Sequence, residues 1–510
     1  MFRRKPQLTF FFFADSLQKK KCMKILDQNT FSPDPSAKPL VSKQALILGQ
    51  FFLIIFVYHI LKDLKDTLVV TASEAGAEVL PFIKIWGMLP LAILASYLFS
   101  KLYHRLGREK TLYFFMTALL AFYIIFAFAL YPLRQELYLG NLANFLKFAL
   151  PIGCKGFISM VCYWIYTLFY VTAELWSLMI LSVLFWGYVN EISTLKQAKH
   201  FYPLCMATGN CAGILSGQTS GFLCRTLIEH VSWQETLQVM ILVVTTCGIG
   251  IMIINRVLAK YHPTKIESKL TKSDSPSFKE SVLAIFQSPQ LCCIALLVVG
   301  FGLTTNLIEV VWKESIKTIH SAPHAYNAYV NQLTSFIGFS AVCVSLVARR
   351  IFKILNWTKV AMLTPITLFT TSLIFFFSLQ APAESIKGIS SYFNMEPAYV
   401  VMTLGSLYYV LAMTSKYTVF DMSKEMAFLS IETDKRIRAK SVIDSIGSRL
   451  GKSGASCLFQ VLLITFGSTS GHIPIVGSIA ILMIGVSIIA TRKLGDYLSK
   501  GDGSYATQGA

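Results

Sequence analysis

The chain has 510 residues, of which 54% are hydrophobic and only 14% are charged, and its mean hydropathy is +0.57. Soluble proteins carry about 25% charged residues, so this composition predicts a polytopic membrane protein. The formal net charge of +19 does not indicate nucleic-acid binding, because short cytoplasmic loops of membrane proteins collect Lys and Arg. A polyanionic substrate would be a further reason for an excess of Lys and Arg. The 11 Cys are scattered and mostly lie in apolar runs, which indicates small buried residues rather than disulfides or a metal site.

Residues 1–43 form a basic head that ends in a Pro- and Ser-containing run, FSPDPSAKP. Its apolar piece, LTFFFFA, is too short to cross a bilayer. We expect a mobile cytoplasmic N-terminal extension.

Apolar segments of about 20 residues, the length that spans a bilayer, recur through the rest of the chain. They lie near 46–70, 79–102, 111–132, 155–190, 201–224, 236–258, 289–312, 326–348, 358–379, 396–420, 440–466 and 472–491. The segment 155–190 exceeds one span, so it is either one long tilted helix or two pieces. The pattern predicts an all-α membrane protein with about twelve transmembrane helices.

Positive charge alternates between the loops. Lys and Arg gather in one set of them: the N-terminus, 101–110, 196–199, 256–272, 349–353, 435–438 and 492–493. The alternate loops near 71–81 and 467–474 contain neither residue type. The positive-inside rule therefore places both termini in the cytoplasm, which requires an even number of spans.

A polar, Lys- and Ser-rich stretch at 259–286 divides the chain into two six-helix bundles, 44–258 and 287–495, and a cytoplasmic tail follows at 496–510. An offset of 241 residues aligns Ala198-Lys199 with Ala439-Lys440, and also Gly213 with Gly454. Such a 6+6 pseudo-repeat is typical of major-facilitator-like transporters, which hold their substrate between the halves.

Several charges interrupt the apolar run from residue 60 to residue 90, ILKDLKDTLVVTASEAGAEVLPFIKIWGMLP. A charge inside a spanning segment is costly unless it has a partner or a task. Lys62 and Lys65, each followed by Asp, are open to a second interpretation as snorkelling residues at the membrane surface. Lys84 lies between Ile83 and Ile85-Trp86, which favours a functional role.

Two glutamates lie in other spans. Glu174 has no charged neighbour from Lys155 to Glu191, so it is either a protonated side chain bonded to another helix or a functional group. The functional roles are proton carrier, ion-pair gate and substrate ligand. Glu309 shares a helix face with Lys313, four residues on, and this pair is either a rim ion pair or part of a site.

Lys452 lies among small residues in IGSRLGKSGASCLFQ, which allow close helix packing or access of a ligand to the backbone. The run is not a phosphate-binding loop of the P-loop type, because Ile446 stands where that motif requires Gly. A Lys in such surroundings can still bind phosphate as a point charge. The sequence shows no arrangement of nucleophile, base and orienting carboxylate.

Taken together, these motifs resemble a known family. They are KDLKDTLVVTA, AEVLPFIKIWGMLP, AELWSLMILSVLFWGYVNEI, NLIEVVWKESIK, FDMSKEMAFL and AKSVIDSIGSRLGKSGAS. From Gln50 to Gly495 the chain is similar to the nucleotide transporters of plastids and obligate intracellular bacteria, the ATP/ADP translocase type, which differ in fold from the mitochondrial carrier.

The resemblance implies a major-facilitator-like transporter that exchanges ATP for ADP or imports nucleotides with protons. Charges that matter in the family fall at Lys84, Glu174, Glu309 and Lys452. Two motifs depart from the usual pattern: KDLKD has Lys62 and Leu64 where Arg and Thr are usual, and Met422-Ser423-Lys424 follows Asp421. These departures leave open which nucleotide is carried.

We therefore expect an ATP/ADP antiporter of a bacterial inner membrane, with Lys84 and Lys452 as a phosphate clamp that pairs with Glu174 and Glu309 when empty. Secondary candidates are Lys65, Asp66, Lys313 and Lys440. The alternatives are proton-coupled import of a nucleoside triphosphate or NAD, and a membrane-embedded enzyme acting on a phosphorylated substrate. The expected partners are a nucleotide and the lipid bilayer, with no nucleic acid, no obligate protein partner, no cofactor and no metal.

Overall fold

The computed structural model describes residues 43–72, 75–192, 195–227, 231–261, 283, 285–431, 440, 442–467 and 469–505. The expected N-terminal extension, except for Lys43, lies outside these residues. So do most of the stretch 259–286 and the end of the expected tail. The chain before residue 262 is called the N half below, and the chain after residue 282 the C half.

The described part of the N half is mostly helical, and π-helical and 3-10 segments, marked η, interrupt the α-helices. In chain order it contains α2 (Lys43–Ala72), η1 (Gly76–Glu78), α3 (Val79–Phe82), η2 (Ile83–Met88), α4 (Leu89–Ile125), η3 (Phe126–Leu130), α5 (Gly140–Ala149), η4 (Ile152–Cys154), α6 (Lys155–Cys162), α7 (Trp164–Leu175), η5 (Trp176–Phe185), α8 (Trp186–Ile192), α9 (Leu195–Leu227) and α10 (Trp233–Tyr261). Helix α4 covers parts of two expected spans and breaks at Gly107, whose φ is 74°.

The described part of the C half also consists mainly of α-helices, with π-helical segments between some of them. It contains α12 (Pro289–Ile319), α13 (Pro323–Ile354), α14 (Trp357–Gln380), α15 (Ala383–Phe393), α16 (Pro397–Ser415), η6 (Lys416–Phe420), α17 (Asp421–Leu429), η7 (Ile443–Gly447), α19 (Ser448–Phe466) and α20 (Thr469–Tyr505). Gly213 lies in α9 and Gly454 in α19, so the proposed repeat relates two long helices, one in each half.

Ten helices among the described residues are long and apolar enough to cross a membrane. The all-α membrane class is therefore confirmed, but the expected number of twelve is not. The two expected spans that fail this criterion correspond to α9 and α19, which carry more polar and small residues.

The long segment 155–190 is two pieces. Helix α6 ends at Cys162, and Tyr163, with φ −96° and ψ 44°, breaks the chain before α7 begins. The Trp164 ring nitrogen donates to the Leu137 carbonyl at 3.0 Å, which fixes the start of α7. Only the second piece, from Trp164 to Val189, is long enough to span.

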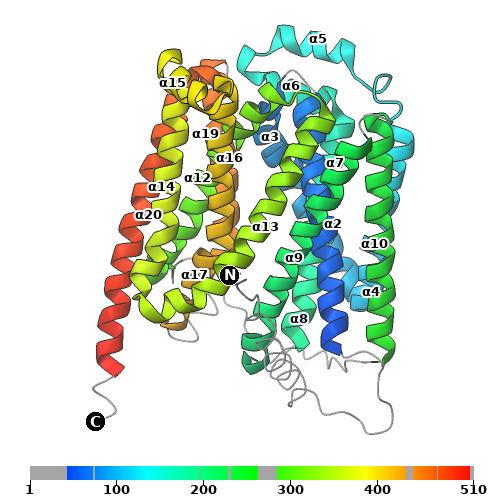
Figure 1. The fold of residues 1–510 in the computed structure, drawn as a ribbon. Helices are drawn as coiled ribbons and strands as arrows, with labels where there is room; N and C mark the ends of the chain where they lie inside the picture. Colours follow the sequence, from blue (N-terminus) through cyan, green and yellow to red (C-terminus); the bar gives the residue numbers. More distant parts are fainter. Residues whose placement is uncertain are drawn as a thin grey trace, which may run out of the picture.

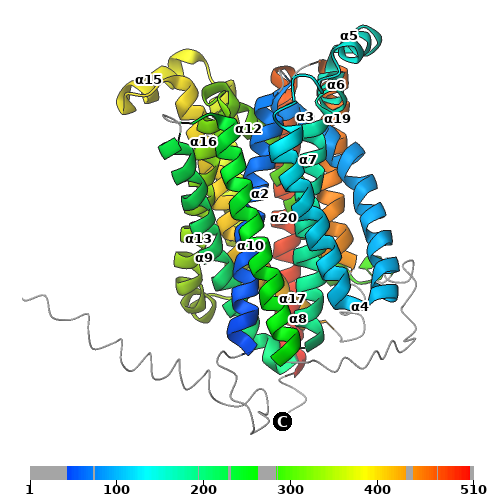
Figure 2. The same cartoon turned by 90° about the vertical axis from the view of Figure 1, so that its right-hand side faces the viewer.

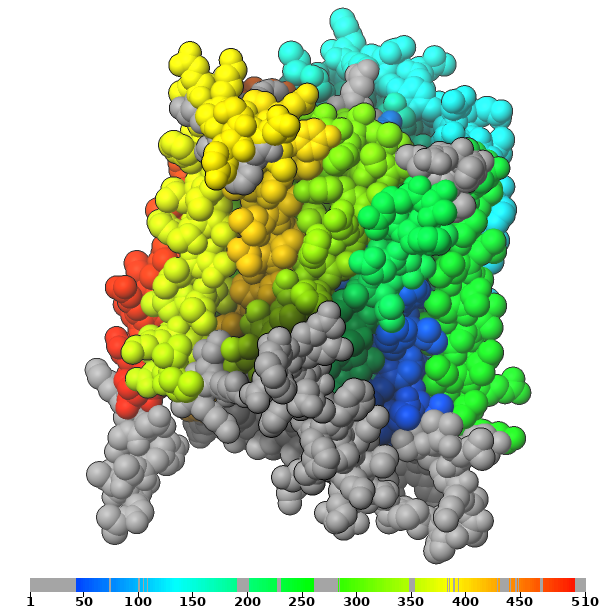
Figure 3. All heavy atoms as spheres, viewed as in Figure 1, coloured from blue at the N-terminus to red at the C-terminus, as the bar shows by residue number. Residues whose placement is uncertain are grey.

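The two halves stand side by side (Figure 1), and α2 begins and α20 ends at the same, lower end of the bundle. The short helices α3, α5, α6 and α15 lie at the upper end in both views (Figures 1 and 2). On the face drawn in Figure 3, the side chains of α13 fill the seam between the halves.

Upper ends of the two halves are in close contact. The Ala77 backbone N–H in η1 donates to the Glu314 carboxylate of α12 at 2.7 Å, and Gly76 before it has the φ of 55° that favours glycine. A Cβ on Gly153 of η4 would lie 1.9 Å from the Leu463 carbonyl of α19, so only glycine fits there. Gln460 of α19 also donates to the Pro81 carbonyl at 2.8 Å. These contacts close the seam at the upper end.

Candidate functional site

A network of alternating positive and negative side chains begins in the N half at Lys65. Its ammonium group lies 2.9 Å from Asp66 and 3.1 Å from Glu174 of α7, and it stacks 3.9 Å over the centre of the Tyr170 ring. Glu174, isolated in the sequence, thus has a partner on a neighbouring helix. The side chain of Lys65 is only 6% exposed, whereas that of Glu174 is 31% exposed.

The network of charges continues into the C half through Lys313. Its ammonium group lies 2.7 Å from Asp66 and 2.6 Å from Glu309. The second oxygen of Glu309 lies 3.1 Å from Lys84, which returns the network to the N half. Lys84 also donates to the Asn306 side chain at 2.8 Å. Carboxylates and ammonium groups of both halves therefore form one continuous network.

The network has a buried centre and partly exposed ends. The side chains of Lys313 and Asp66 are 3% and 2% exposed, whereas those of Lys84 and Glu309 are each 19% exposed. A buried ion pair is costly to break, because removing one partner leaves an uncompensated charge. The centre is therefore suited to holding the halves together, and the ends reach a space that solvent enters.

Lys452 lies outside the network. It is exposed, and within the described part of the chain it makes no ion pair or hydrogen bond through its ammonium group. Nevertheless, it lies within electrostatic range of Glu174, Lys84 and Glu309, which come from both halves. Lys452 is therefore an exposed cation whose charged neighbours come from both halves.

Local helix geometry explains how these charges are presented. Lys84 belongs to the π-helical η2. Glu174 lies two residues before the start of η5, and Lys452 lies five residues after the end of η7. Pro90, near the start of α4, has no N–H to donate to the Trp86 carbonyl, which favours the wider turn of η2. π-Helical turns are rare and occur frequently at functional sites. The sequence analysis did not anticipate them.

Other predicted residues lie elsewhere. Lys440 pairs with Glu425, and the neighbouring Lys424 lies 2.8 Å from Asp444. These contacts join elements of the C half alone, next to α17, and the structure does not bring Lys440 to the network. Lys62 lies 3.4 Å from Asp63.

Polar residues that the sequence analysis missed support the network. Asn306 contacts Lys84, and Asn327 donates to the Thr67 hydroxyl at 2.8 Å across the halves. Thr334 similarly donates to Asp63 at 2.8 Å. Uncharged Asn and Thr gave no signal in the sequence, because such residues are common in helix contacts of membrane proteins.

A pocket with an empty volume of about 360 Å³ adjoins Lys62, between α2, α9, α13, α16 and η6. Its lining residues come from both halves: His59, Lys62, Asn210, Gly213, Thr334, Ile337, Gly338, Tyr409, Met413 and Tyr417. It combines a cation with aromatic rings, a composition suited to a nucleotide.

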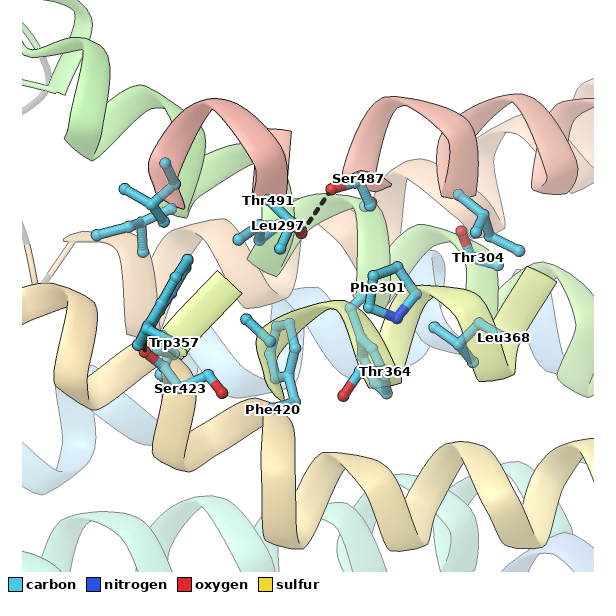
Figure 4. Close-up of a pocket in the computed structure, with 17 residues that line it drawn as sticks. Leu297, Phe301, Thr304, Trp357, Thr364, Leu368, Phe420, Ser423, Ser487 and Thr491 are labelled. Carbon is cyan, nitrogen blue, oxygen red and sulfur yellow. Dashed lines mark hydrogen bonds between the residues drawn. The ribbon is translucent and has the colours of Figure 1, made fainter. Parts of the chain in front are cut away.

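A larger pocket of about 540 Å³ lies inside the C half (Figure 4), and Lys424 is the one charged residue of its mainly apolar lining.

The arrangement of lysines and carboxylates is suited to binding an anion. The described residues contain no group of three or more His, Cys, Asp or Glu side chains that could hold a metal ion. Lysine ammonium groups fixed by carboxylates can instead exchange those partners for the phosphates of a ligand.

Comparisons with known proteins agree over most of the chain. The family model described as TLC ATP/ADP transporter matches residues 38–497. "ADP,ATP carrier protein 2" of Chlamydia pneumoniae is 33% identical over 496 residues, which cover 93% of this chain and 92% of that protein. "ADP,ATP carrier protein 1, chloroplastic" of Arabidopsis thaliana is 33% identical over 459 residues, or 89% of this chain and 73% of that protein.

Solved structures support the fold. A bacterial homologue of the iron transporter ferroportin has a TM-score of 0.56 at 12% identity and covers 90% of this chain and 100% of its own. A D-xylose-proton symporter has a TM-score of 0.52 at 14% identity and covers 88% and 96%. The fold is therefore major-facilitator-like. With the family match over residues 38–497, the chain is a transporter rather than an enzyme, and it belongs to the TLC ATP/ADP transporter family.

Proposed function

We propose that this protein exchanges ATP for ADP across a bacterial inner membrane by alternating access of one site between its two halves. The site consists of Lys84, Glu174, Glu309 and Lys452. The observation that carries the proposal is the ion-pair network that both halves build, together with the exposed Lys452, which has no ion-pair partner among the described residues. The proposal is supported by the family and by relatives named ADP,ATP carriers.

Phosphates of the nucleotide bind to Lys452 and Lys84 in this scheme. Lys84 lies 3.1 Å from Glu309, so a phosphate that binds Lys84 displaces a carboxylate rather than water alone. Lys65 and Lys313 keep their buried partners and position the glutamates. Occupancy of the site then changes which ion pairs cross the seam, and this couples substrate binding to movement of the halves.

The proposed orientation places both termini in the cytoplasm, with six-helix bundles at 44–258 and 287–495. The lower end in Figure 1, where α2 begins, is then cytoplasmic. Contacts such as Glu314 with Ala77 then close the seam at the end that faces away from the cytoplasm.

Exchange in proteoliposomes tests the proposal. Vesicles preloaded with ADP should take up labelled ATP, and empty vesicles should not, even under an imposed pH gradient. Unlabelled ATP and ADP should compete far better than AMP or adenosine, because the phosphates carry recognition. Accumulation in empty vesicles that follows the pH gradient would instead establish proton-coupled nucleotide import. Equal competition by adenosine would contradict phosphate recognition.

A further inference from the structure

Three hydroxyl groups line the larger pocket of the C half without a hydrogen-bond partner. They belong to Thr304 of α12, Thr364 of α14 and Ser423 of α17, whose exposed fractions are only 1%, 1% and 4%. Their hydroxyl oxygens make no hydrogen bond within the described part of the chain. Because buried hydroxyls are nearly always bonded, three unbonded ones around a single cavity need a common explanation.

Other hydroxyls in the same helices follow the usual pattern, in which Ser and Thr bond to a backbone carbonyl one turn earlier. Thr305, next to Thr304 in α12, donates to the Phe301 carbonyl at 2.7 Å. Thr491 of α20 lines the pocket and donates to the Ser487 carbonyl at 2.8 Å (Figure 4). The three unpartnered hydroxyls make no such bond, so they remain available to a ligand.

A backbone acceptor lies in the same lining. Pro365 has no N–H to donate to the Ala361 carbonyl, four residues earlier in α14. Both residues line the pocket. The cavity therefore offers hydroxyl donors together with a carbonyl that lacks its usual helical partner, a combination that suits a ligand with a hydroxyl or ester oxygen.

The rest of the wall is mainly apolar. The rings of Phe301 and Phe420, which both line the pocket, stack at 5.0 Å between their centres. Figure 4 places Ser423 at one end of the pocket, Thr304 at the other and Thr364 between them. A volume of about 540 Å³ with an apolar wall and a few polar groups is typical of sites for small molecules. The shape suits an alkyl chain.

The charged group at the pocket does not call for a charged ligand. Lys424 lies 2.8 Å from Asp444 and 3.9 Å from Asp421, so its charge is already compensated. A carboxylate or ammonium group in this pocket would bring an additional charge into apolar surroundings, which is costly without a partner. The ligand that fits is therefore uncharged.

We propose that this pocket binds an uncharged amphiphile, an alkyl chain that carries a hydroxyl or ester oxygen, independently of the nucleotide. The oxygen accepts hydrogen bonds from the unpartnered hydroxyls, and the chain packs against the apolar faces of α12, α14 and α20. The described lining includes none of the residues assigned above to the nucleotide site. The two sites are therefore separate, although α12 contributes to both.

Photolabelling of the full-length protein in lipid nanodiscs tests the proposal, with a diazirine analogue of 1-octanol as the probe. Labelling should saturate and should map by mass spectrometry to the pocket-lining stretches of α12, α14 or α20. Unlabelled 1-octanol should displace the probe. Octane, which has no oxygen, and octanoate, which is charged, should each need an about 10-fold higher concentration in the lipid. Saturating ATP should leave labelling unchanged.

Two variants remove a hydroxyl and keep the shape of the side chain, namely Thr304→Val and Thr364→Val. Each should raise the half-saturating concentration of 1-octanol about 2- to 10-fold, the usual effect of one lost hydrogen bond. Neither should lower the melting temperature without ligand, because the lost hydroxyl is buried and unbonded. Thr371→Val is the matched control: its hydroxyl lies outside the lining and donates to the Thr367 carbonyl at 2.6 Å, so affinity should stay at the wild-type value.

A bulkier variant, Ala361→Phe, fills the pocket and should abolish saturable labelling. Wild-type affinity for 1-octanol in both Val variants would overturn the proposal, as would octanoate that binds as tightly as 1-octanol. A lower melting temperature of the Val variants with unchanged labelling would show that water bonds these hydroxyls instead. Displacement of the probe by ATP would contradict a separate site. Labelling does not depend on transport, so it is informative even if ATP/ADP exchange is not observed.

Discussion

The Lys313 ammonium group lies 2.7 Å from the Asp66 carboxylate and joins α12 of the C half to α2 of the N half. Each partner also has a substitute in its own half: Lys313 has Glu309 at 2.6 Å, and Asp66 has Lys65 at 2.9 Å. The link across the seam can therefore break without leaving a buried charge unpaired. This is a useful property in a protein whose halves must move apart, because stranded charges would otherwise block the movement.

Because Lys313 has two carboxylate partners, Asp66 and Glu309, we expect their removal to have a strongly non-additive effect on the free energy of unfolding. Asp66→Asn leaves Lys313 with Glu309, and Glu309→Gln leaves it with Asp66, so each single variant should lose little. The double variant removes both carboxylates and should lose about 3–5 kcal/mol, the usual cost of a stranded buried charge. Thermal denaturation in detergent measures this. Losses that simply add would show that Lys313 finds another partner.

Lys84 is expected to be essential for transport but not for folding. Lys84→Gln removes a partly exposed cation, while Glu309 keeps its contact with Lys313 at 2.6 Å. Affinity for ATP should therefore fall about 10- to 100-fold, and exchange should be lost near the wild-type half-saturating concentration. The variant should still insert and elute as a single species, as should the control Lys359→Gln, which removes an exposed charge near the start of α14. Normal exchange by a well-inserted Lys84→Gln protein would remove Lys84 from the proposed clamp.

Glu314 should hold the upper end of the seam closed. Its carboxylate accepts from the Ala77 N–H at 2.7 Å, and Glu314→Ala removes this contact between the halves. Conformations open at the upper end should then become more populated. Cys154 offers a native probe, because it is buried in η4 beside the contact of Gly153 with Leu463.

Cysteine labelling reads out this opening. Burial raises the pKa of the Cys154 thiol, so the closed form should react slowly with a maleimide near neutral pH, because the thiolate is the reactive species. Glu314→Ala should accelerate labelling of Cys154, measured by mass spectrometry of its peptide. Labelling of Cys205, buried within α9, is the internal control. An unchanged Cys154 rate would mean that Glu314 does not hold the seam closed.

Sequence reasoning found the charges but not all their partners. Apolar surroundings revealed Lys84 and Glu174, and helical spacing anticipated the Glu309 contact with Lys313, since both signals are local. The contact of Asp66 with Lys313 joins residues 247 positions apart, which no local pattern encodes. Glu174 was expected to pair with a clamp lysine, but in the structure it contacts Lys65.

The long-range arrangement explains the remaining differences. Lys440 follows the same repeat signal as Lys199, yet it pairs with Glu425 and lies apart from the network. The helix break at Tyr163 and the π-helical turn at Lys84 depend on packing against other helices and are not visible in hydropathy. The segments that form α9 and α19 were predicted as spans from apolar runs of about 20 residues, but neither helix is among the ten that are long and apolar enough to cross a membrane in the described part of the chain.

The two glutamates test whether protons take part in the cycle. Glu→Gln keeps the shape of the side chain and mimics a permanently protonated carboxyl group. If a glutamate carries a proton, its Gln variant should lose accumulation driven by a pH gradient but retain nucleotide exchange, which needs no net proton movement.

The ion pairs in the structure favour a pairing role, and they predict that the two variants differ. Glu174→Gln leaves Lys65 with Asp66 at 2.9 Å, whereas Glu309→Gln leaves Lys84 with only the neutral Asn306 at 2.8 Å. An unpaired, partly buried charge opposes reorientation of the empty site. Net flux should therefore fall more in Glu309→Gln than in Glu174→Gln, and exchange should suffer less in both, because the site reorients while loaded.

Both activities are measured in the same proteoliposomes, with and without preloaded ADP and with the pH gradient set independently. Wild-type uptake should not respond to an inward proton gradient, because both glutamates remain ionised and paired. Gradient-driven uptake that disappears in only one of the Gln variants would identify that glutamate as a proton carrier. The protein would then be a proton-coupled nucleotide importer rather than an antiporter, although the same lysines would still bind the phosphates.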